Sequence, residues 1–215
     1  MKYLCNEIPW EDIKAIGFDM DGTLYDEFDF IIQVYEPIAS LFYNSISDIN
    51  TIKNSMLLKW LEKGSSYPFI FSEIAVETGL ESDLHEKKIK EALLIYRNFI
   101  PTLFLTERIK FLLEELKGKY ELFLVSDGSS TLQWNKIKAL NLENYFDKQN
   151  IFVSGDHGKR AEKPGLMSLN HLAVFNKSFE KNEVVFIGDR SNDEGYAKNA
   201  GFYFIDINKK NNLYL

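Results

Sequence analysis

Residues 15–24 read AIGFDMDGTL, a short apolar run that ends in two aspartates one residue apart. Residues 15–18 have the length and apolar character of a buried strand. Open α/β sheets bind ligands at the carboxyl ends of their strands, so Asp19 and Asp21 are expected at a ligand-binding edge. A carboxylate there can act as a nucleophile towards phosphorus, its neighbour can move protons, and both offer oxygen ligands for Mg²⁺. Taken alone, the pair could also be an ordinary acidic turn after a strand.

Further apolar runs of the same kind lie at residues 122–125, 151–153 and 184–187, and a possible fifth strand lies at 202–205. Helical patterns fill the intervals between the later runs, as in residues 131–140, where leucine and isoleucine recur at helical spacing. Alternating strands and helices indicate a parallel sheet covered by helices on both faces. The sequence therefore predicts an α/β fold, with a Rossmann-like parallel sheet flanked by helices.

The interval between residues 28 and 100 departs from this alternation. Its patterns predict helices at residues 30–45, 51–62, 71–78 and 84–99, separated by turn-forming segments at 64–68 and at Gly79. An interval of this length is too long for a crossover loop. We expect residues 28–100 to form an inserted α-helical domain, and residues 1–27 and 101–215 to form the sheet-containing core domain.

The composition narrows the classes of function. The 215 residues are 45% hydrophobic, with no uninterrupted apolar stretch of the roughly 18 residues that a membrane span needs. The formal net charge of −7 argues against a general nucleic-acid binder, although a metal ion and local cations can still attract a phosphorylated small molecule. A single cysteine, Cys5, excludes an internal disulfide framework and suits the reducing cytoplasm. We expect a cytoplasmic protein with no membrane or nucleic-acid partner.

Polar residues follow the second strand as well. The run that begins at residue 122 delivers Ser126 to the same sheet edge as Asp19. The Ser126 hydroxyl and the backbone N–H groups of the following residues, including Asp127 and Gly128, can bind phosphoryl oxygens. A polar turn that caps the next helix would explain this segment equally well when it is taken alone.

Two later segments add charged groups. Lys163 precedes a predicted helix over about residues 166–175, and from the mouth of that helix it can neutralise a nucleophile and a phosphate together. Residues 184–193 form a buried run that leads into Gly188 and Asp189, and Asp193 follows on the first turn of a predicted helix. Helix capping explains either acid alone but not the doubled acid, which suits a Mg²⁺ site with few protein carboxylates.

These four segments, in this order, resemble the motifs of the haloacid dehalogenase superfamily in its phosphatase form. The resemblance runs over about residues 14–201, and it includes Gln133, Lys136 and the segment 197–201. It implies that the helical insert is a C1-type cap, which closes over the active site.

The resemblance also implies catalytic and metal-binding roles. Asp19 would be the nucleophile that becomes aspartyl-phosphate, and Asp21 would protonate the leaving alcohol and then activate water. Mg²⁺ would bind Asp19, Asp189 and the backbone carbonyl of Asp21, with Asp193 as a direct ligand or as a partner of one.

The remaining implied roles concern the phosphoryl group. Ser126 and Lys163 would hold it within the loop that contains Asp127 and Gly128, and Lys163 would also brace the nucleophile. Lys163, which is followed by Pro164, lies further from Gly158 in the sequence than is usual in this superfamily. Lys159 is therefore a competing candidate, although the Lys-Pro pair favours Lys163.

Three functions remain open on the sequence. The favoured one is a Mg²⁺-dependent phosphomonoester hydrolase that acts on a small phosphorylated metabolite. A phosphotransferase or phosphosugar mutase would use the same residues, and a non-catalytic binding module on the same fold is disfavoured by the intact acids and lysine. A dehalogenase is disfavoured because Asp21 is present. Specificity is expected from the cap, with Tyr67 and Phe69 as candidates, while the role of Arg190 and the oligomeric state stay undetermined.

Overall fold

The chain is described by a computed structural model that covers residues 5, 7–43, 48–177 and 180–208, except for the side chain of Lys159. It divides into two compact units. One comprises Met1–Asp26 together with Leu103–Leu215, and the other comprises Glu27–Thr102. We call the first the sheet unit and the second the helical unit.

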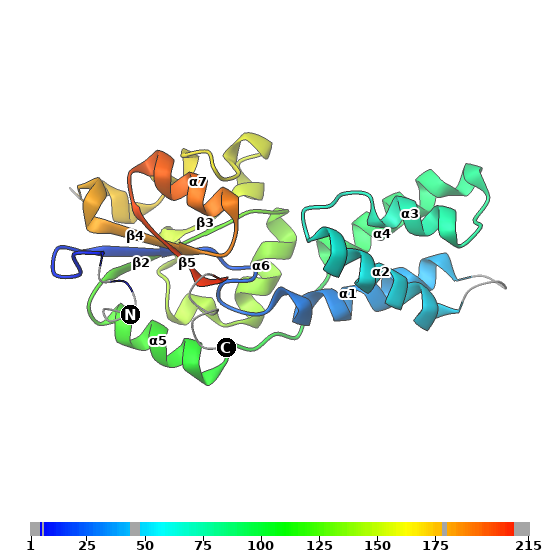
Figure 1. The fold of residues 1–215 in the computed structure, drawn as a ribbon, viewed down its shortest axis with the longest axis horizontal. Helices are drawn as coiled ribbons and strands as arrows, with labels where there is room; N and C mark the ends of the chain where they lie inside the picture. Colours follow the sequence, from blue (N-terminus) through cyan, green and yellow to red (C-terminus); the bar gives the residue numbers. More distant parts are fainter. Residues whose placement is uncertain (1–4, 6, 44–47, 178–179, 209–215) are drawn as a thin grey trace. The chain divides into compact units, whose positions relative to one another are not determined.

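The sheet unit contains a five-stranded sheet in the order β3-β2-β1-β4-β5 (Figure 1). Its strands are β1 (Ala15–Phe18), β2 (Glu121–Ser126), β3 (Ile151–Val153), β4 (Val184–Gly188) and β5 (Tyr203–Asp206). All four strand pairings are parallel. Because β1 lies between β2 and β4, successive strands are added first on one side of β1 and then on the other. A crevice for a ligand is expected at such a switch point, at the carboxyl ends of the strands. The predicted fold class is confirmed.

Among the described residues, three α-helices accompany the sheet: α5 (Glu107–Lys117), α6 (Ser130–Ala139) and α7 (Ser191–Ala200). Helices α5 and α7 lie on opposite faces of the sheet (Figure 1). The side chain of Thr106 caps α5 by accepting a hydrogen bond from the backbone N–H of Ile109. At the carboxyl end of α7, Gly201 takes a left-handed conformation that ends the helix.

Gly17 shows how closely the core packs around the central strand. In register, Gly17 lies between Phe123 of β2 and Phe186 of β4, both fully buried. A Cβ atom at position 17 would lie 2.2 Å from the Phe123 ring and 2.7 Å from the Phe186 ring. The two rings therefore fill the space that a side chain would need, and only glycine fits in the strand that presents Asp19.

The prediction of one continuous helix over residues 166–175 is wrong. Two separate 3-10 turns, Met167–Asn170 and Ala173–Asn176, occupy this region. The break has a tertiary cause, because the backbone N–H of Val174 donates to the side-chain oxygen of buried Asn150 at 2.8 Å. In a continuous helix the same N–H would donate to the carbonyl of Asn170.

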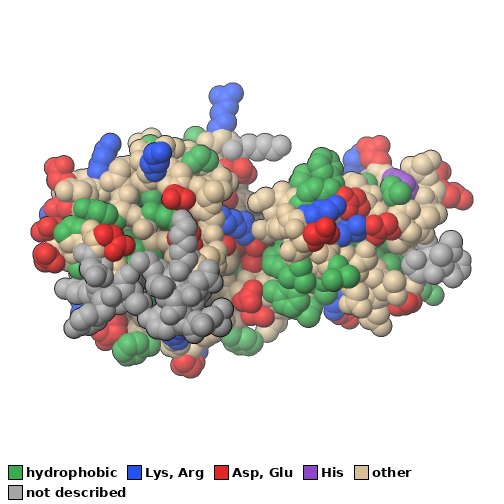
Figure 2. Space-filling model, in the orientation of Figure 1, with side chains coloured by type: hydrophobic (Ala, Val, Ile, Leu, Met, Phe, Trp, Pro, Cys, Tyr) green, Lys and Arg blue, Asp and Glu red, His purple; other side chains and the backbone are tan. Residues whose placement is uncertain are grey.

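The helical unit contains α1 (Glu27–Phe42), α2 (Ile49–Lys63), α3 (Ile70–Glu77) and α4 (Ser82–Asn98). The four predicted helices are therefore present, although the predicted end of the first, residue 45, lies outside the described residues. A cavity of about 150 Å³ within this unit is lined mainly by aromatic side chains, among them Tyr35, Trp60, Tyr67, Phe71 and Tyr96. Hydrophobic side chains also reach the surface of this unit (Figure 2), and Phe69 is 57% exposed. No helix in the described ranges is both long enough and apolar enough for a membrane crossing.

Candidate active site

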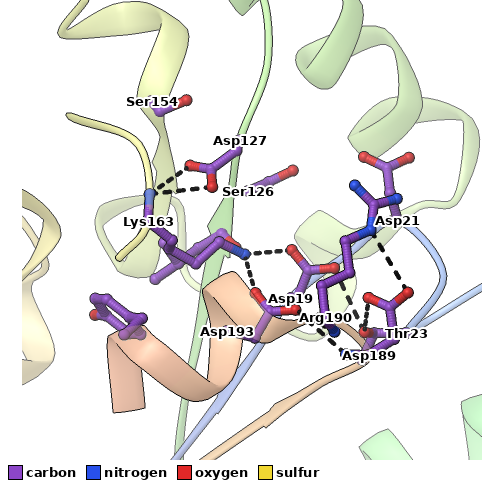
Figure 3. A network of polar contacts seen from close by, with 12 residues as sticks. Asp19, Asp21, Thr23, Ser126, Asp127, Ser154, Lys163, Asp189, Arg190 and Asp193 are labelled. Atoms are coloured by element: carbon purple, nitrogen blue, oxygen red, sulfur yellow. Dashed lines mark hydrogen bonds and ion pairs between the residues drawn. The ribbon is translucent and has the colours of Figure 1, made fainter. Parts of the chain in front are cut away.

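The predicted site residues of the sheet unit converge at the carboxyl ends of its strands (Figure 3). Asp19 follows β1, Ser126 ends β2 and Asp189 follows β4. The backbone N–H of Asp19 donates to the carbonyl of Ile187 at 2.9 Å, which continues the β1–β4 ladder beyond the strand. The nucleophile candidate is thus held by the backbone of the neighbouring strand.

A cluster of carboxylates lies at this edge. Asp19, Asp189 and Asp193 each contribute an oxygen, and these oxygens all lie within 4.8 Å of one another. The hydroxyl of Thr23 lies 3.4 Å from oxygens of both Asp19 and Asp189. Gly22 is needed beside them, because its φ is +81° and a Cβ atom there would lie 2.5 Å from the Asp189 carboxylate.

Lys163 is the counter-charge of the cluster. It is buried, and its Nζ pairs with Asp19 Oδ1, with Asp193 Oδ1 at 2.7 Å and with the carbonyl of Val125 at 3.1 Å. Burial alone would lower the pKa of Lys163, but the carboxylates of Asp19, Asp193 and Asp127 outweigh it and raise the pKa above its usual range. The lysine is therefore held as a cation. The side chain of Lys159, the competing candidate, lies outside the described residues.

The site carries more negative charge than one lysine balances. Burial raises the pKa of Asp19 to about 7; Lys163 opposes this rise, while the carboxylates of Asp193 and Asp21 add to it. Burial also raises the pKa of Asp189 above its usual value. A divalent cation would stabilise the ionised carboxylates, and an all-oxygen set of this kind is what Mg²⁺ prefers. The residues therefore fit the expected metal.

Asp193 also organises the backbone next to the cluster. Its second oxygen accepts hydrogen bonds from the backbone N–H groups of Asp189 at 3.2 Å and Arg190 at 3.0 Å. This arrangement fixes the loop that presents Asp189 at the start of α7. The Nε atom of Arg190 lies 3.6 Å from the Asp189 carboxylate.

The loop after β2 is already highly hydrogen-bonded. The carboxylate of Asp127 accepts the backbone N–H of Lys163 at 3.1 Å, which joins this loop to the lysine. The backbone N–H of Gly128, expected among the phosphate-binding groups, donates instead to the hydroxyl of Ser154 at 3.1 Å. The buried hydroxyl oxygen of Ser126 accepts a hydrogen bond at 2.7 Å from Gln133, so its O–H remains a donor.

The carboxylate of Asp21 points away from the acidic cluster (Figure 3). It forms an ion pair with Lys136 at 2.6 Å, and it accepts hydrogen bonds from Gln133 at 2.7 Å and from the hydroxyl of Tyr25. Burial alone would raise the pKa of Asp21, but the charge of Lys136 and these donors outweigh it and lower the pKa below its usual value. Asp21 is thus held in its ionised form.

Several residues around Asp19 and Asp21 have no role that the sequence pattern indicates. The resemblance included Gln133 and Lys136, whose spacing of three places them on one face of a helix, but nothing local links that face to Asp21. Thr23 and Tyr25 follow Asp19 and Asp21 by four residues each, and this regular spacing after the strand was the available signal.

Several known proteins that resemble this chain are phosphatases. The chain is 29% identical over 195 residues to a glyceraldehyde 3-phosphate phosphatase of Pyrococcus furiosus, which covers 88% of this chain and 78% of the relative. It is 25% identical to a phosphoglycolate phosphatase of Vibrio parahaemolyticus, over 89% of this chain and 82% of that protein. A crystal structure of a haloacid dehalogenase superfamily hydrolase from Geobacter sulfurreducens shares the fold, with a TM-score of 0.67 at 20% identity and coverage of 91% and 87%.

The model of one protein family matches residues 16–207, which include every catalytic and metal-ligand candidate named above. Together with the relatives, this match confirms the sequence-based assignment to a hydrolase of the phosphatase type. The chain belongs to the haloacid dehalogenase-like hydrolase family.

Proposed function

We propose that this enzyme is a Mg²⁺-dependent phosphomonoester hydrolase that works through a phosphorylated Asp19. The observation that carries the proposal is the environment of Asp19, a buried carboxylate that pairs with the cation of Lys163 and lies close to the carboxylates of Asp189 and Asp193. Phosphoryl transfer depends mainly on alignment and on neutralising charge on the transferred group. The pairing of Asp19 with Lys163 supports this role, because it holds a carboxylate and a cation in fixed positions.

The first step forms a bond between an Asp19 oxygen and phosphorus and breaks the bond to the leaving oxygen. The leaving alkoxide takes a proton from the Asp21 carboxyl group in its protonated form, which the surrounding donors make the minor form, and the leaving group departs as an alcohol. The Lys163 ammonium and the Ser126 hydroxyl donate to the phosphoryl oxygens. Asp19, Asp189 and the backbone carbonyl of Asp21, with Asp193 in support, would hold Mg²⁺, and the bound ion would supply further positive charge to the phosphoryl group.

In the second step water attacks the phosphorus of the aspartyl-phosphate and Asp21 removes a proton from that water. Inorganic phosphate leaves, and Asp19 returns to its carboxylate form. The donors around Asp21 favour its ionised form, which is the form that takes a proton from water. The surroundings of Asp21 therefore suit the hydrolytic step particularly well.

We propose a small phosphorylated metabolite as the substrate. The named substrates of the relatives, glyceraldehyde 3-phosphate and phosphoglycolate, are of this class. The site groups of the sheet unit would contact only the phosphoryl group, which every phosphomonoester offers alike, and the metal. The choice of leaving group is therefore assigned to the helical unit, whose aromatic cavity includes Tyr67.

The test measures phosphate release from a panel of phosphorylated metabolites and an aryl phosphate, with Mg²⁺ or with EDTA. Wild-type protein should release phosphate only with Mg²⁺ and without a sugar acceptor, which separates hydrolysis from phosphotransfer and mutase activity. Asp19→Asn should lose activity by several orders of magnitude while remaining folded, because the covalent route requires the carboxylate.

The matched control is Asp83→Asn, an exposed aspartate on α4, which should keep wild-type turnover. Intact mass after an acid quench should show a phosphoryl adduct on wild-type protein and none on Asp19→Asn. Unchanged turnover in Asp19→Asn would remove Asp19 from the mechanism.

A further inference from the structure

Three side chains that have no assigned role enclose the carboxylate of Asp21. Lys136 Nζ lies 2.6 Å from Oδ1, Gln133 Nε2 lies 2.7 Å from Oδ2, and the hydroxyl of Tyr25 donates to Oδ1. Both carboxylate oxygens therefore have fixed donors, and the side chain has a defined direction within the sheet unit. A carboxylate at an exposed turn would instead be solvated by water.

Two of the three donors come from one face of α6. Gln133 and Lys136 are separated by three residues, so their side chains lie side by side on the helix. Both are almost completely buried, with exposed fractions of 1% and 2%. Lysine is almost never fully buried unless it is paired. The burial of Lys136 beside Asp21 therefore indicates a built ion pair rather than a side chain that reaches for solvent.

Gln133 also ties Asp21 to the loop that follows β2. Its Nε2 atom lies 2.7 Å from the hydroxyl oxygen of Ser126 and 2.9 Å from the carbonyl of Asp127, in addition to its contact with Asp21. The group that moves protons and the group that donates to the phosphoryl oxygens thus share one hydrogen-bonding partner. Their separation is set by the position of α6.

We propose that Lys136, together with Gln133, is a positioning residue that holds the Asp21 carboxylate in the direction required to activate the hydrolytic water. This inference rests on the proposed function, because it concerns the second step of that reaction. Proton transfer depends steeply on placement, and a displacement of about 1 Å can cost about 10²-fold in rate. Without the lysine, the carboxylate can rotate away from its donors and from the water that it serves.

The experiment separates the two chemical steps with an aryl phosphate, whose leaving group needs little help from an acid. In Lys136→Met, formation of the phosphorylated enzyme should stay near the wild-type rate while its hydrolysis slows by about 10²-fold. Rapid mixing should then show a stoichiometric burst of the aryl alcohol followed by slow turnover, with kcat and KM falling together so that kcat/KM stays near the wild-type value. Intact mass should show phosphorylated protein accumulating during turnover.

The controls lie on the same helix and at the same pair. Lys138→Met, an exposed position of α6, should behave as wild type. Lys136→Arg keeps a cation and should recover part of the hydrolytic rate. If Lys136→Met does not fold, Lys136→Gln keeps a polar side chain and removes the charge of the ion pair, and a burst of the same kind is expected.

A folded Lys136→Met that loses the burst and the turnover together, or that keeps wild-type turnover, would overturn the positioning role. So would a folded Lys136→Gln protein without a burst in the case where it replaces Lys136→Met. Wild-type protein that releases no phosphate with Mg²⁺ would instead contradict the proposed function itself. The two failures are therefore distinguishable.

Discussion

Replacing Lys163 with methionine should destabilise the metal-free sheet unit strongly. The change leaves Asp19 and Asp193 facing each other in a buried site without the cation that now pairs with both. Removing one partner of a buried ion pair costs about 3–5 kcal/mol. For a chain of this length each kcal/mol lowers Tm by about 2–4 °C, so the expected decrease is about 6–20 °C.

The size of this effect has an internal control. Lys14 pairs with Glu183 at 2.5 Å, but its side chain is 53% exposed. An exposed pair contributes about 1 kcal/mol or less, so Lys14→Met should lower Tm by at most about 4 °C. Similar geometry in two different dielectric environments thus predicts clearly different losses.

Thermal unfolding should be followed by tryptophan fluorescence in EDTA and in a Trp60→Phe background. Of the three tryptophans, the remaining Trp10 and Trp134 both belong to the sheet unit that contains Lys163. The signal then reports this unit alone.

The loss should also depend on pH. The pKa of Asp19 lies at about 7 in the folded protein against an ordinary value of 3.8, so its proton is bound more tightly when folded. The stability that this group contributes is therefore fully present below about pH 3.8, and it falls as the pH rises from there to about 7. Lys163 opposes this rise in the pKa of Asp19, so its removal should raise that pKa further. The variant should therefore lose more stability at about pH 8 than at about pH 5.

A Lys163→Met protein as stable as Lys14→Met at both pH values would refute the buried pairing. Activity discriminates between the two candidate lysines, since Lys163→Met should abolish phosphate release and Lys159→Met should not. The opposite result would assign the phosphoryl-binding role to Lys159.

Two further changes test the packing and the specificity. Gly17→Ala should cost about 1–3 kcal/mol in the free energy of unfolding, because its Cβ would lie 2.2 Å from the Phe123 ring; urea titration measures the loss, and a second change, Phe123→Leu, should recover part of it. Tyr67→Ala and Phe69→Ala in the helical unit should reorder a panel of phosphorylated substrates and leave the Mg²⁺ dependence intact; an unchanged ranking in folded variants would move specificity to the sheet unit, with Arg190 as the first residue to test.

The strands, and the positions of the acids at the sheet edge, could be predicted from the sequence alone. Each buried strand is a short apolar run, and the residue after it must lie at the sheet edge, so Asp19, Ser126 and Asp189 could be placed together without coordinates. The helices within residues 27–98 could also be predicted from local sequence, because amphipathic periodicity is set by neighbours three and four positions away.

Contacts between distant segments decided the rest. Lys136 and Asp21 are 115 residues apart, and Lys163 and Asp19 are 144 residues apart, so no local pattern specifies either pair. The helix predicted over residues 166–175 failed for the same reason, since the side chain of Asn150 takes the N–H that would have continued it. Periodicity and spacing describe what a segment can form by itself, whereas the partner of a buried charge or of a backbone N–H is chosen by how separate segments pack.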